Sequence, residues 1–465
     1  MFVLITESFH NTCFFLYVRP RFYDPRWHWE YTRNASFLTD ATLATADTNA
    51  TVYALFKGLS EWWASHLKKE MVSGGGGSYI FSDLDDCAEE DTNYYNRPSR
   101  FKQTDNVCNG TGFMDKWNIT LINSTRPPTA DPRITRNPGL SLAMAKKVLQ
   151  AAVDASTVLG LDADRRAVWS DIAQHLAPTP RGSIPDPCEF RSPPRHGQTN
   201  CIKNASSRPI TVLLEQEHPK GLTRGNPVVM QAIFPGERVG MDSSVMERRI
   251  ARQTVETAGA ALGAWTQSNS FPHTVNAAVR AGMDPREILG NLTKQLNVTM
   301  LNRNSPKGLL QFDGSQGQEC AGASQAVNDM LCSSYSGYIH LFERWPLEED
   351  ASFTTLRTHG GFLVSASLHG GVVNNVTVTM SSEAGEPVVL VSPWASKSFA
   401  VKGEQGQAVA VAPGARQGTY TWKTTKGASY TVSPQDLVKR PRVAMHAWAV
   451  MTSSDSVDPQ HHSRQ

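Results

Sequence analysis

Residues 323–346, ASQAVNDMLCSSYSGYIHLFERWP, decide how this chain divides into structural parts. Apolar residues recur at helical spacing over residues 326–331, and Gly337 ends that pattern. Residues 338–342 then read as extended chain, and apolar and polar residues alternate over 375–380 as in a half-buried strand. The sequence therefore predicts a helical part followed, from residue 338, by a β-part.

The chain before this junction reads as a succession of helices separated by long loops. Its 465 residues suit two or three domains. Apolar residues with helical spacing predict helices over 51–69, 137–160, 162–177, 243–260, 273–282, 284–296 and 321–334. We expect Asn137 and Pro138 to begin the second of these and Gly160 to end it. The Pro-, Arg- and Ser-rich residues 178–209 read as a loop.

Composition excludes several classes of function. The net charge is +2, and no basic stripe is interleaved with aromatic residues, which argues against a nucleic-acid partner. No apolar run reaches the roughly 18 residues of a membrane span. No Cys/His cluster has the spacing of a zinc site. We predict no metal and no cofactor.

Nine Asn-X-Ser/Thr sequons favour a secretory route over chance occurrence, although residues 1–20 make a poor signal peptide: Asn34, Asn49, Asn109, Asn118, Asn123, Asn204, Asn291, Asn297 and Asn375. Seven cysteines are present. If the compartment is oxidising, Cys87 with Cys108 and Cys188 with Cys201 are candidate pairs. A helix over 321–334 would keep Cys320 and Cys332 too far apart to pair.

Several motifs together resemble glycoside hydrolase family 95, the α-L-fucosidase family. AVNDML and YIHLFERWP resemble the family's EMLLQSHDG and IHLLPALP, and TLRTHGGF (355–362) resembles its GL-x-A-RGGF strand. WHWEYT (27–32) resembles WHYEYTGD, and LDADRRAVWSDIAQHLAPTP (161–180) resembles GVDADLRAKWQDI-x-x-HLAPYP. IFPGERVGMDSS (233–244) resembles FPGEQIGLDS.

This resemblance, which covers roughly residues 27–432, implies a mainly α fold. Residues 1–337 would form a partial (α/α)6 toroid of glycosidase type, and 338–435 a C-terminal antiparallel β-domain. Residues 436–465 would be a tail, disordered at its end. Relatives carry further elements before this point, so we expect an N-terminally truncated barrel that is weakly stable or inactive alone.

The resemblance also implies an inverting mechanism with two carboxyl groups about 6.5–9.5 Å apart. One is a protonated acid and the other an ionised base. In DDCAEED (85–91), relatives read NDAAHEG, which places Glu90 on the family's acid. A solvated acidic turn or a calcium loop is the alternative interpretation of the same residues.

Two residues compete for the role of base. Asp313 lies in QFDGS, which matches the first half of the family's FQIDGNFG. Ungapped alignment backwards from Met330 and Leu331 instead places Gln318 on the family's Asp, with Glu319 beside it. Some relatives read GGGIEN there, which favours Glu319. A plain Asp-Gly turn is the structural alternative for Asp313.

Candidate substrate-binding residues are Trp27, Trp29, Glu237 and His273. Indole rings supply stacking faces for sugars, although core packing is the commoner role of a tryptophan. Glu237 either lines the pocket or pairs with Arg238. The histidines of the family's RHLSH segment and an upstream N-x-N motif have no counterpart here, which puts fucose specificity in doubt.

The leading hypothesis is a secreted inverting glycosidase acting on an oligosaccharide or polysaccharide. A non-catalytic carbohydrate-binding or scaffold protein is the second hypothesis. Another α/α-barrel enzyme, such as a polysaccharide lyase, is the third. Fold alone does not choose among them.

Overall fold

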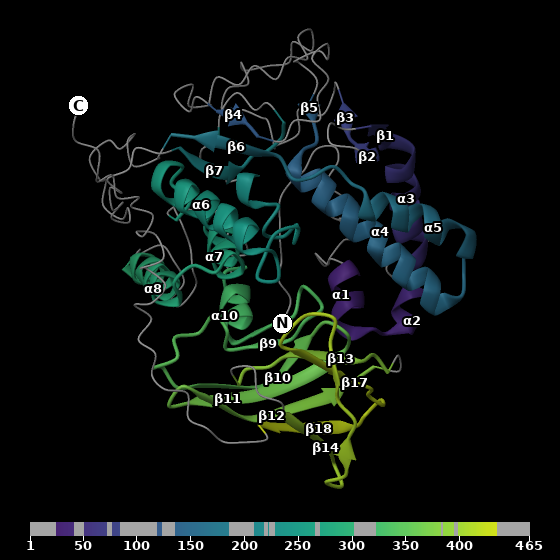
Figure 1. The fold of residues 1–465 in the computed structure, drawn as a ribbon, viewed down its shortest axis with the longest axis vertical. Coiled ribbons are helices and arrows are strands. Elements are labelled where there is room, and N and C mark those ends of the chain that lie inside the picture. Colours follow the sequence, from purple (N-terminus) through teal and green to yellow (C-terminus); the bar gives the residue numbers. More distant parts are fainter. Residues whose placement is uncertain are drawn as a thin grey trace, which may run out of the picture.

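The computed structural model describes residues 25–40, 51–71, 77–83, 119–122, 135–185, 209–217, 222, 228–265, 270–301, 322–382, 385–394 and 399–434. Glu90, Asp313 and Glu319 lie outside these ranges, as does the predicted tail. Within them, helices come first and antiparallel strands follow, and a C-terminal sheet domain is confirmed (Figure 1).

The helices from residue 52 onward lie at the predicted positions, although the last ends at Leu331, before the strand that begins at Cys332, and the two short helices before residue 51 were not predicted. They are α1 (Pro25–Thr32), α2 (Ala35–Leu38), α3 (Val52–His66), α4 (Gly139–Leu159), α5 (Ala163–Gln174), α6 (Val245–Ala261), α7 (Ser270–Ala281), α8 (Pro285–Leu301) and α10 (Ser324–Leu331). Gly160 ends α4 in the left-handed conformation (φ 68°), as predicted.

Asn137 does not cap α4. Pro138 occupies the N-cap position, and no side chain there accepts a hydrogen bond from the helix. Asn137 has a φ of 52°, its Oδ1 accepts from the Phe81 amide at 3.2 Å, and its Nδ2 donates to Glu217 at 2.7 Å. The buried amide therefore joins two segments that are distant in sequence.

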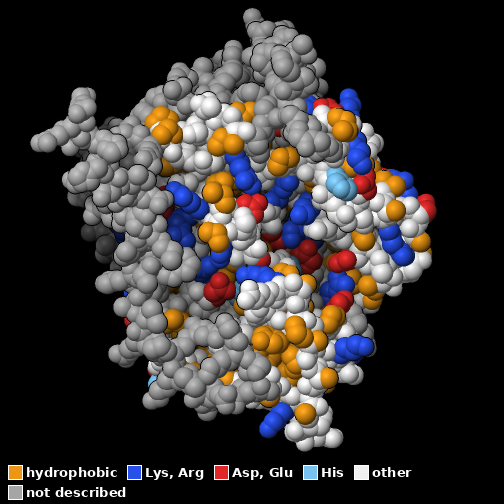
Figure 2. Space-filling view, in the orientation of Figure 1, with side chains coloured by type: hydrophobic (Ala, Val, Ile, Leu, Met, Phe, Trp, Pro, Cys, Tyr) orange, Lys and Arg blue, Asp and Glu red, His pale blue; other side chains and the backbone are white. Residues whose placement is uncertain are grey.

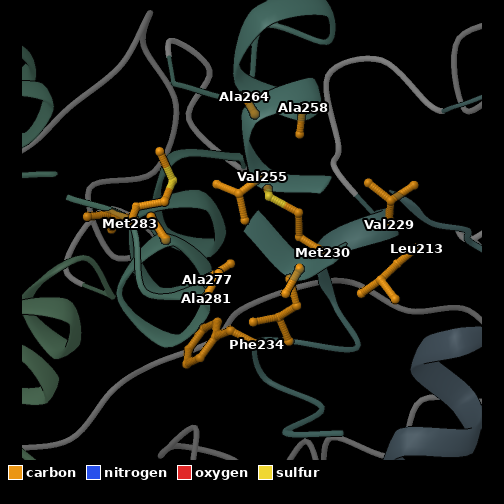
Figure 3. Packing of buried hydrophobic residues seen from close by; sticks show 14 of the residues in the cluster. Leu213, Val229, Met230, Phe234, Val255, Ala258, Ala264, Ala277, Ala281 and Met283 are labelled. Atoms are coloured by element: carbon orange, nitrogen blue, oxygen red, sulfur yellow. The ribbon is translucent and has the colours of Figure 1, made fainter. Parts of the chain in front are cut away.

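Three hydrophobic cores organise these elements. One lies among α1 to α5, with α4 packed between α3 and α5. The second joins α6, α7 and the 3-10 helix η3 (Val228–Met230), and residues such as Phe234, Val255 and Ala277 converge there (Figure 3). The two helical groups stand on opposite sides of the view, above the C-terminal sheets (Figure 1).

The helical part also contains short sheets that the sequence did not predict. These are β1 (Lys68–Met71) with β2 (Gly77–Ile80), β3 (Ser82–Asp83) with β5 (Thr135–Arg136), and β4 (Thr120–Leu121) with β6 (Arg181–Ile184) and β7 (Ile210–Leu213). The expected loop over 178–209 thus includes β6. A four-residue strand is too short for alternation to stand out, yet Ile184 and Val212 reach the second core.

The C-terminal part consists of two antiparallel sheets around the third core. The larger has the order β10 (Ala351–Thr358), β11 (Phe362–His369), β12 (Val372–Met380), β18 (Ser429–Pro434), β14 (Phe399–Gly403) and β15 (Ala408–Val409). The smaller has the order β13 (Val388–Val391), β17 (Thr419–Trp422) and β16 (Ala412–Pro413). On β12, Val376, Val378 and Met380 are buried, which confirms the predicted alternation.

The junction is short and directly bonded to both parts. A two-stranded ribbon of β8 (Cys332–Ser333) and β9 (His340–Leu341) follows α10, and the Ile339 amide donates to Val389 at 2.8 Å. Cys332 is a buried free thiol. Helix α1 also meets the β-part, since Gly360 donates to the Glu30 carbonyl at 2.9 Å.

Candidate functional site

A group of charged side chains lies buried where the two helical groups and the β-part meet. Acidic and basic side chains gather in a recess at the middle of this face of the molecule (Figure 2). Six charged side chains with little exposure to solvent, here called the buried ion cluster, come from five segments far apart in sequence: Arg26 and Glu30 on α1, Lys147 on α4, Glu237, Arg280 on α7 and Asp329 on α10.

Backbone geometry places Glu237 in this cluster. The preceding turn packs so tightly that a Cβ at Gly236 would lie 2.6 Å from the Ala143 side chain. Glu237 itself has a φ of 54°, in the left-handed region. The turn aims its carboxylate inward, where the side chain is only 2% exposed.

Three cations surround the Glu237 carboxylate. Lys147 forms an ion pair with it, Arg280 Nη1 lies 3.2 Å from Oε1, and Arg26 Nη1 lies 3.9 Å from Oε2. Burial alone would raise the pKa of this carboxyl, but Lys147, Arg280 and Arg26 lower it to about 2. Glu237 is therefore ionised at neutral pH and is not a proton donor.

Arg280 connects Glu237 to the helix that follows the predicted base segment. Its Nε donates to Asp329 Oδ2 at 3.0 Å, and its guanidinium carbon lies 4.0 Å from the centroid of the Tyr335 ring. Burial lowers the pKa of Arg280, but Asp329 and Glu237 reverse that effect and raise it. Burial raises the pKa of Asp329, and Arg280 opposes that change. The two carboxylates thus hold Arg280 protonated against the effect of burial.

His359 links the cluster to the β-part. It follows β10, stacks edge-on against Tyr31 at 4.4 Å, and places Nε2 3.6 Å from Glu30 Oε2. Glu30 also accepts from Arg26 at 3.1 Å. Burial lowers the pKa of His359 to about 4, although Glu30 and Glu237 act in the opposite direction. His359 is therefore neutral at pH 7.

A second polar group joins the 233–244 motif to the β-part. His340 Nε2 lies 3.1 Å from Asp242 Oδ2, and its Nδ1 contacts Glu343. Asp242 also pairs with Arg416, which precedes β17. Burial would raise the pKa of Glu343, but the contact with His340 lowers it.

The predicted sugar-binding residues occupy different environments. Trp27 is half-buried, with its ring 6.4 Å from that of Phe234. Trp29 is 0% exposed, and the Arg33 guanidinium lies 4.3 Å from its ring centroid, so core packing is its observed role. His273 is buried on α7 and stacks edge-on against Phe234 at 6.0 Å.

Glu237 pairs with Arg26, Lys147 and Arg280, not with its neighbour Arg238. Arg238 instead donates from Nη2 to the Ala177 carbonyl at 2.6 Å. This bond joins the 233–244 motif to the 161–180 motif. The motifs singled out in the sequence therefore contact one another around the ion cluster.

Sequence reasoning missed most members of the cluster. Glu30 and Asp329 lie within the motifs quoted above, as does the neighbouring His359, but residue type alone does not predict their partners. Arg280 had one available signal, because it is the charged residue in the apolar run AAVRA of a helix that is buried along its whole length. A charge at such a position requires a partner.

The arrangement is charge-balanced. Among the six members, three cations face three carboxylates, and every carboxylate has a cationic partner. Such a network holds segments in register more readily than it transfers protons. Within the described ranges, no three His, Cys, Asp or Glu side chains lie close enough to hold a metal ion. None of the helices described combines the length and the apolar character of a membrane span.

Comparison with known proteins adds little. No family model matches the sequence, and no curated protein matches it. Among solved structures, a protein described as a kojibiose phosphorylase from the human microbiome has 12% identity and a TM-score of 0.29, covering 64% of this chain and 38% of that one. A GH127 β-L-arabinofuranosidase from Geobacillus stearothermophilus T6 has 12% identity and a TM-score of 0.18, covering 63% and 42%. This chain thus spans well under half the length of either neighbour.

The descriptions of both neighbours are those of carbohydrate-processing enzymes.

Proposed function

We propose that this chain is an inverting glycoside hydrolase of the α-L-fucosidase type, built on an (α/α)6 toroid and acting on terminal glycosidic bonds of an oligosaccharide or polysaccharide. One observation carries the proposal. Segments that resemble family motifs, separated by up to several hundred residues, meet at the buried ion cluster through Glu30, Glu237, Asp329 and His359. Contacts among these segments support a fold around the site like that of the family whose motifs they resemble.

In this proposal Glu90 donates a proton to the glycosidic oxygen. Asp313 or Glu319 removes a proton from the attacking water, which adds to the anomeric carbon from the opposite face. The glycosidic bond breaks, and the sugar is released with inverted configuration. No metal or cofactor takes part in the proposed reaction.

The described residues would shape and stiffen the site. Trp27 is half-buried, so part of its ring is available for stacking on a sugar. Trp29, Glu237 and His273 are buried, which suits walls and supports better than direct stacking. The balanced charges around Glu237 would hold α1, α4, α7 and α10 at fixed spacing.

We also propose that the protein passes through the secretory route. Among the described sequons, Asn34 and Asn375 are exposed to solvent, as a glycosylated residue must be. A mass decrease after enzymatic deglycosylation of protein from a eukaryotic secretory host tests this, and an unchanged mass at both sites would contradict it.

A non-catalytic carbohydrate-binding or scaffold protein is the second candidate. One observation favours it: all three carboxylates of the ion cluster are paired with cations, and the pKa of Glu237 is about 2. None of these groups is arranged as a general acid. The catalytic hypothesis therefore depends on Glu90 and its partner.

The test is a matched pair of variants, Glu90→Gln and Glu89→Gln, assayed on two substrates. One is an aryl α-L-fucoside with an activated leaving group, and the other is a fucosylated oligosaccharide. Loss of a general acid typically costs 10²- to 10⁴-fold in rate, and an activated leaving group needs little protonation. We expect Glu90→Gln to lose turnover of the oligosaccharide and to keep much of its activity on the aryl substrate, whereas Glu89→Gln keeps both.

The base is identified in the same assay, since Asp313→Asn or Glu319→Gln should abolish turnover of both substrates. Nuclear magnetic resonance should show the β-anomer as the first product. Equal loss on both substrates in Glu90→Gln, or release of the α-anomer, would contradict the proposal. Saccharide binding by a wild-type protein that turns over neither substrate would favour the non-catalytic candidate.

A further inference from the structure

A second group of cations lies beside the buried ion cluster, and two of its three members form no ion pair with the described residues. Lys146, Arg181 and Arg238, here called the basic cluster, come from α4, β6 and the turn after Glu237. Lys146 and Arg238 are the chain neighbours of Lys147 and Glu237, so the two clusters share the same segments.

Arg238 is a guanidinium that has no anionic partner among the described residues. Its Nη2 donates to the Ala177 carbonyl at 2.6 Å, and its Nη1 is buried with no hydrogen-bond partner. No carboxylate of the described residues forms an ion pair with it. Burial lowers the pKa of Arg238 to about 10, and repulsion from Arg181 contributes.

Lys146 repeats this pattern on α4. It is half-buried and forms no ion pair with the described residues. Burial lowers the pKa of Lys146, followed by repulsion from Arg238 and Lys147. Lys147 is paired with Glu237, whereas Lys146 has no such carboxylate.

Arg181 completes the cluster and, unlike the other two members, forms an ion pair. Its Nη2 lies 3.2 Å from Glu247 Oε1, at the start of α6. The cations without an ion pair to a described carboxylate are thus Arg238 and Lys146. The buried ion cluster, whose members include the chain neighbours of these residues, pairs three cations with three carboxylates.

Like charges that are partly removed from water repel one another unless an anion lies among them. A buried donor without a partner also calls for an explanation, and a bound ion is one of the few that apply. Guanidinium forks bind carboxylate and sulfate oxygens in pairs, and a lysine ammonium adds a point charge. All three features point to the same kind of ligand.

We propose that the basic cluster binds an anionic group, a carboxylate or a sulfate, carried by a saccharide. Arg238 and Lys146 make the main contacts, and Arg181 shares its charge between Glu247 and the ligand. Anion binding itself follows from the residues of the cluster alone. The saccharide as carrier rests on the proposed function, and it narrows the substrate class to acidic glycans.

Binding is measured by calorimetry at low salt with four probes: inorganic sulfate, glucuronate, a glucose sulfate and neutral glucose. The variants are Arg238→Gln, Arg238→Lys and Lys146→Gln. Lys402→Gln, which removes an exposed charge on β14, is the matched control. A hydrogen bond to a charged group typically changes affinity by about tenfold or more.

We expect wild type to bind the anionic probes in preference to glucose, and 0.5 M salt to weaken that binding. Arg238→Gln and Lys146→Gln should each bind about tenfold more weakly. Arg238→Lys should recover part of the loss, and Lys402→Gln should match wild type. Preference for glucuronate would identify a uronate, and preference for the glucose sulfate or for inorganic sulfate would identify a sulfate.

Equal binding of glucose and glucuronate by wild type, or unchanged anion affinity in Lys146→Gln, would overturn the proposal. If Arg238→Gln fails to fold, Lys146→Gln and Arg238→Lys decide the question. Anion binding without glycosidase turnover would remove the proposed function and leave this site standing. Turnover of neutral fucosides without anion binding would support the proposed function and remove the anion site.

Discussion

Replacing Glu237 by Gln removes the carboxylate that Arg26, Lys147 and Arg280 share, while keeping the shape of the side chain. The pKa of Glu237 is about 2 in the folded protein, against an ordinary value of 4.5. At about 1.4 kcal/mol per pH unit, this difference corresponds to roughly 3 kcal/mol of stability at neutral pH. Removing one partner of a buried pair costs about 3–5 kcal/mol in other proteins, which agrees in order of magnitude.

The same pKa fixes the pH range in which the effect appears. A carboxyl with a depressed folded pKa contributes its full stability above its unfolded value of 4.5. That contribution is lost as pH falls through the folded value of about 2. Below that pH, Glu237 is protonated and resembles Gln. The difference between wild type and Glu237→Gln should therefore shrink steadily between pH 4.5 and pH 2.

Urea unfolding followed by tryptophan fluorescence at pH 7, 4.5 and 2.5 measures this difference. Glu349→Gln, at an exposed position after the junction, is the control and should unfold with wild type. A Glu237→Gln protein that unfolds at the same urea concentration as wild type at pH 7 would refute the reasoning. So would a difference that stays constant down to pH 2.5, because it would then have no electrostatic origin.

Two further predictions concern single positions. In Gly240→Ala the new Cβ would collide with the Tyr335 hydroxyl, which accepts from the Met241 amide at 2.7 Å, so the melting temperature should fall. Gly58→Ala, in an open part of α3, should gain about 0.5–1 kcal/mol, and equal behaviour of the two variants would contradict this. The pKa of His359 falls from 6.5 to about 4 on folding, so the unfolded chain binds more protons between those values. Wild-type melting temperature should therefore drop from pH 6.5 to 4 more steeply than that of His359→Gln, with the exposed His369→Gln following wild type.

The longer helices and the alternation of β12 could be predicted because they depend on local periodicity. Residues 139–159 repeat apolar side chains at helical spacing and end at a glycine, and α4 ends as that pattern requires. Strand β12 alternates over enough residues for its buried face to be read directly. Both features depend only on residues that are neighbours in the sequence.

Features that depend on distant partners could not be predicted in the same way. Asn137 precedes a helix and matches a cap by type, yet its amide is used by Phe81 and Glu217. Strands β6 and β7 are short and separated, so only their pairing reveals them. Arg280 contacts Glu237 and Asp329, each more than 40 residues away in sequence. No pattern of neighbouring residues predicts these two contacts.

The motifs that resemble a glycosidase family also form contacts between residues that are distant in sequence. Glu30, Asp329 and His359 belong to the segments that resemble a glycosidase family, but in the structure they contact one another and the cations between them. These contacts hold α1, α7, α10 and the β-part together whether or not the protein turns over a substrate. The motifs therefore support the fold more strongly than the reaction. Evidence for catalysis must therefore come from the proposed acid, and replacing Glu90 separates a loss of turnover from a loss of stability.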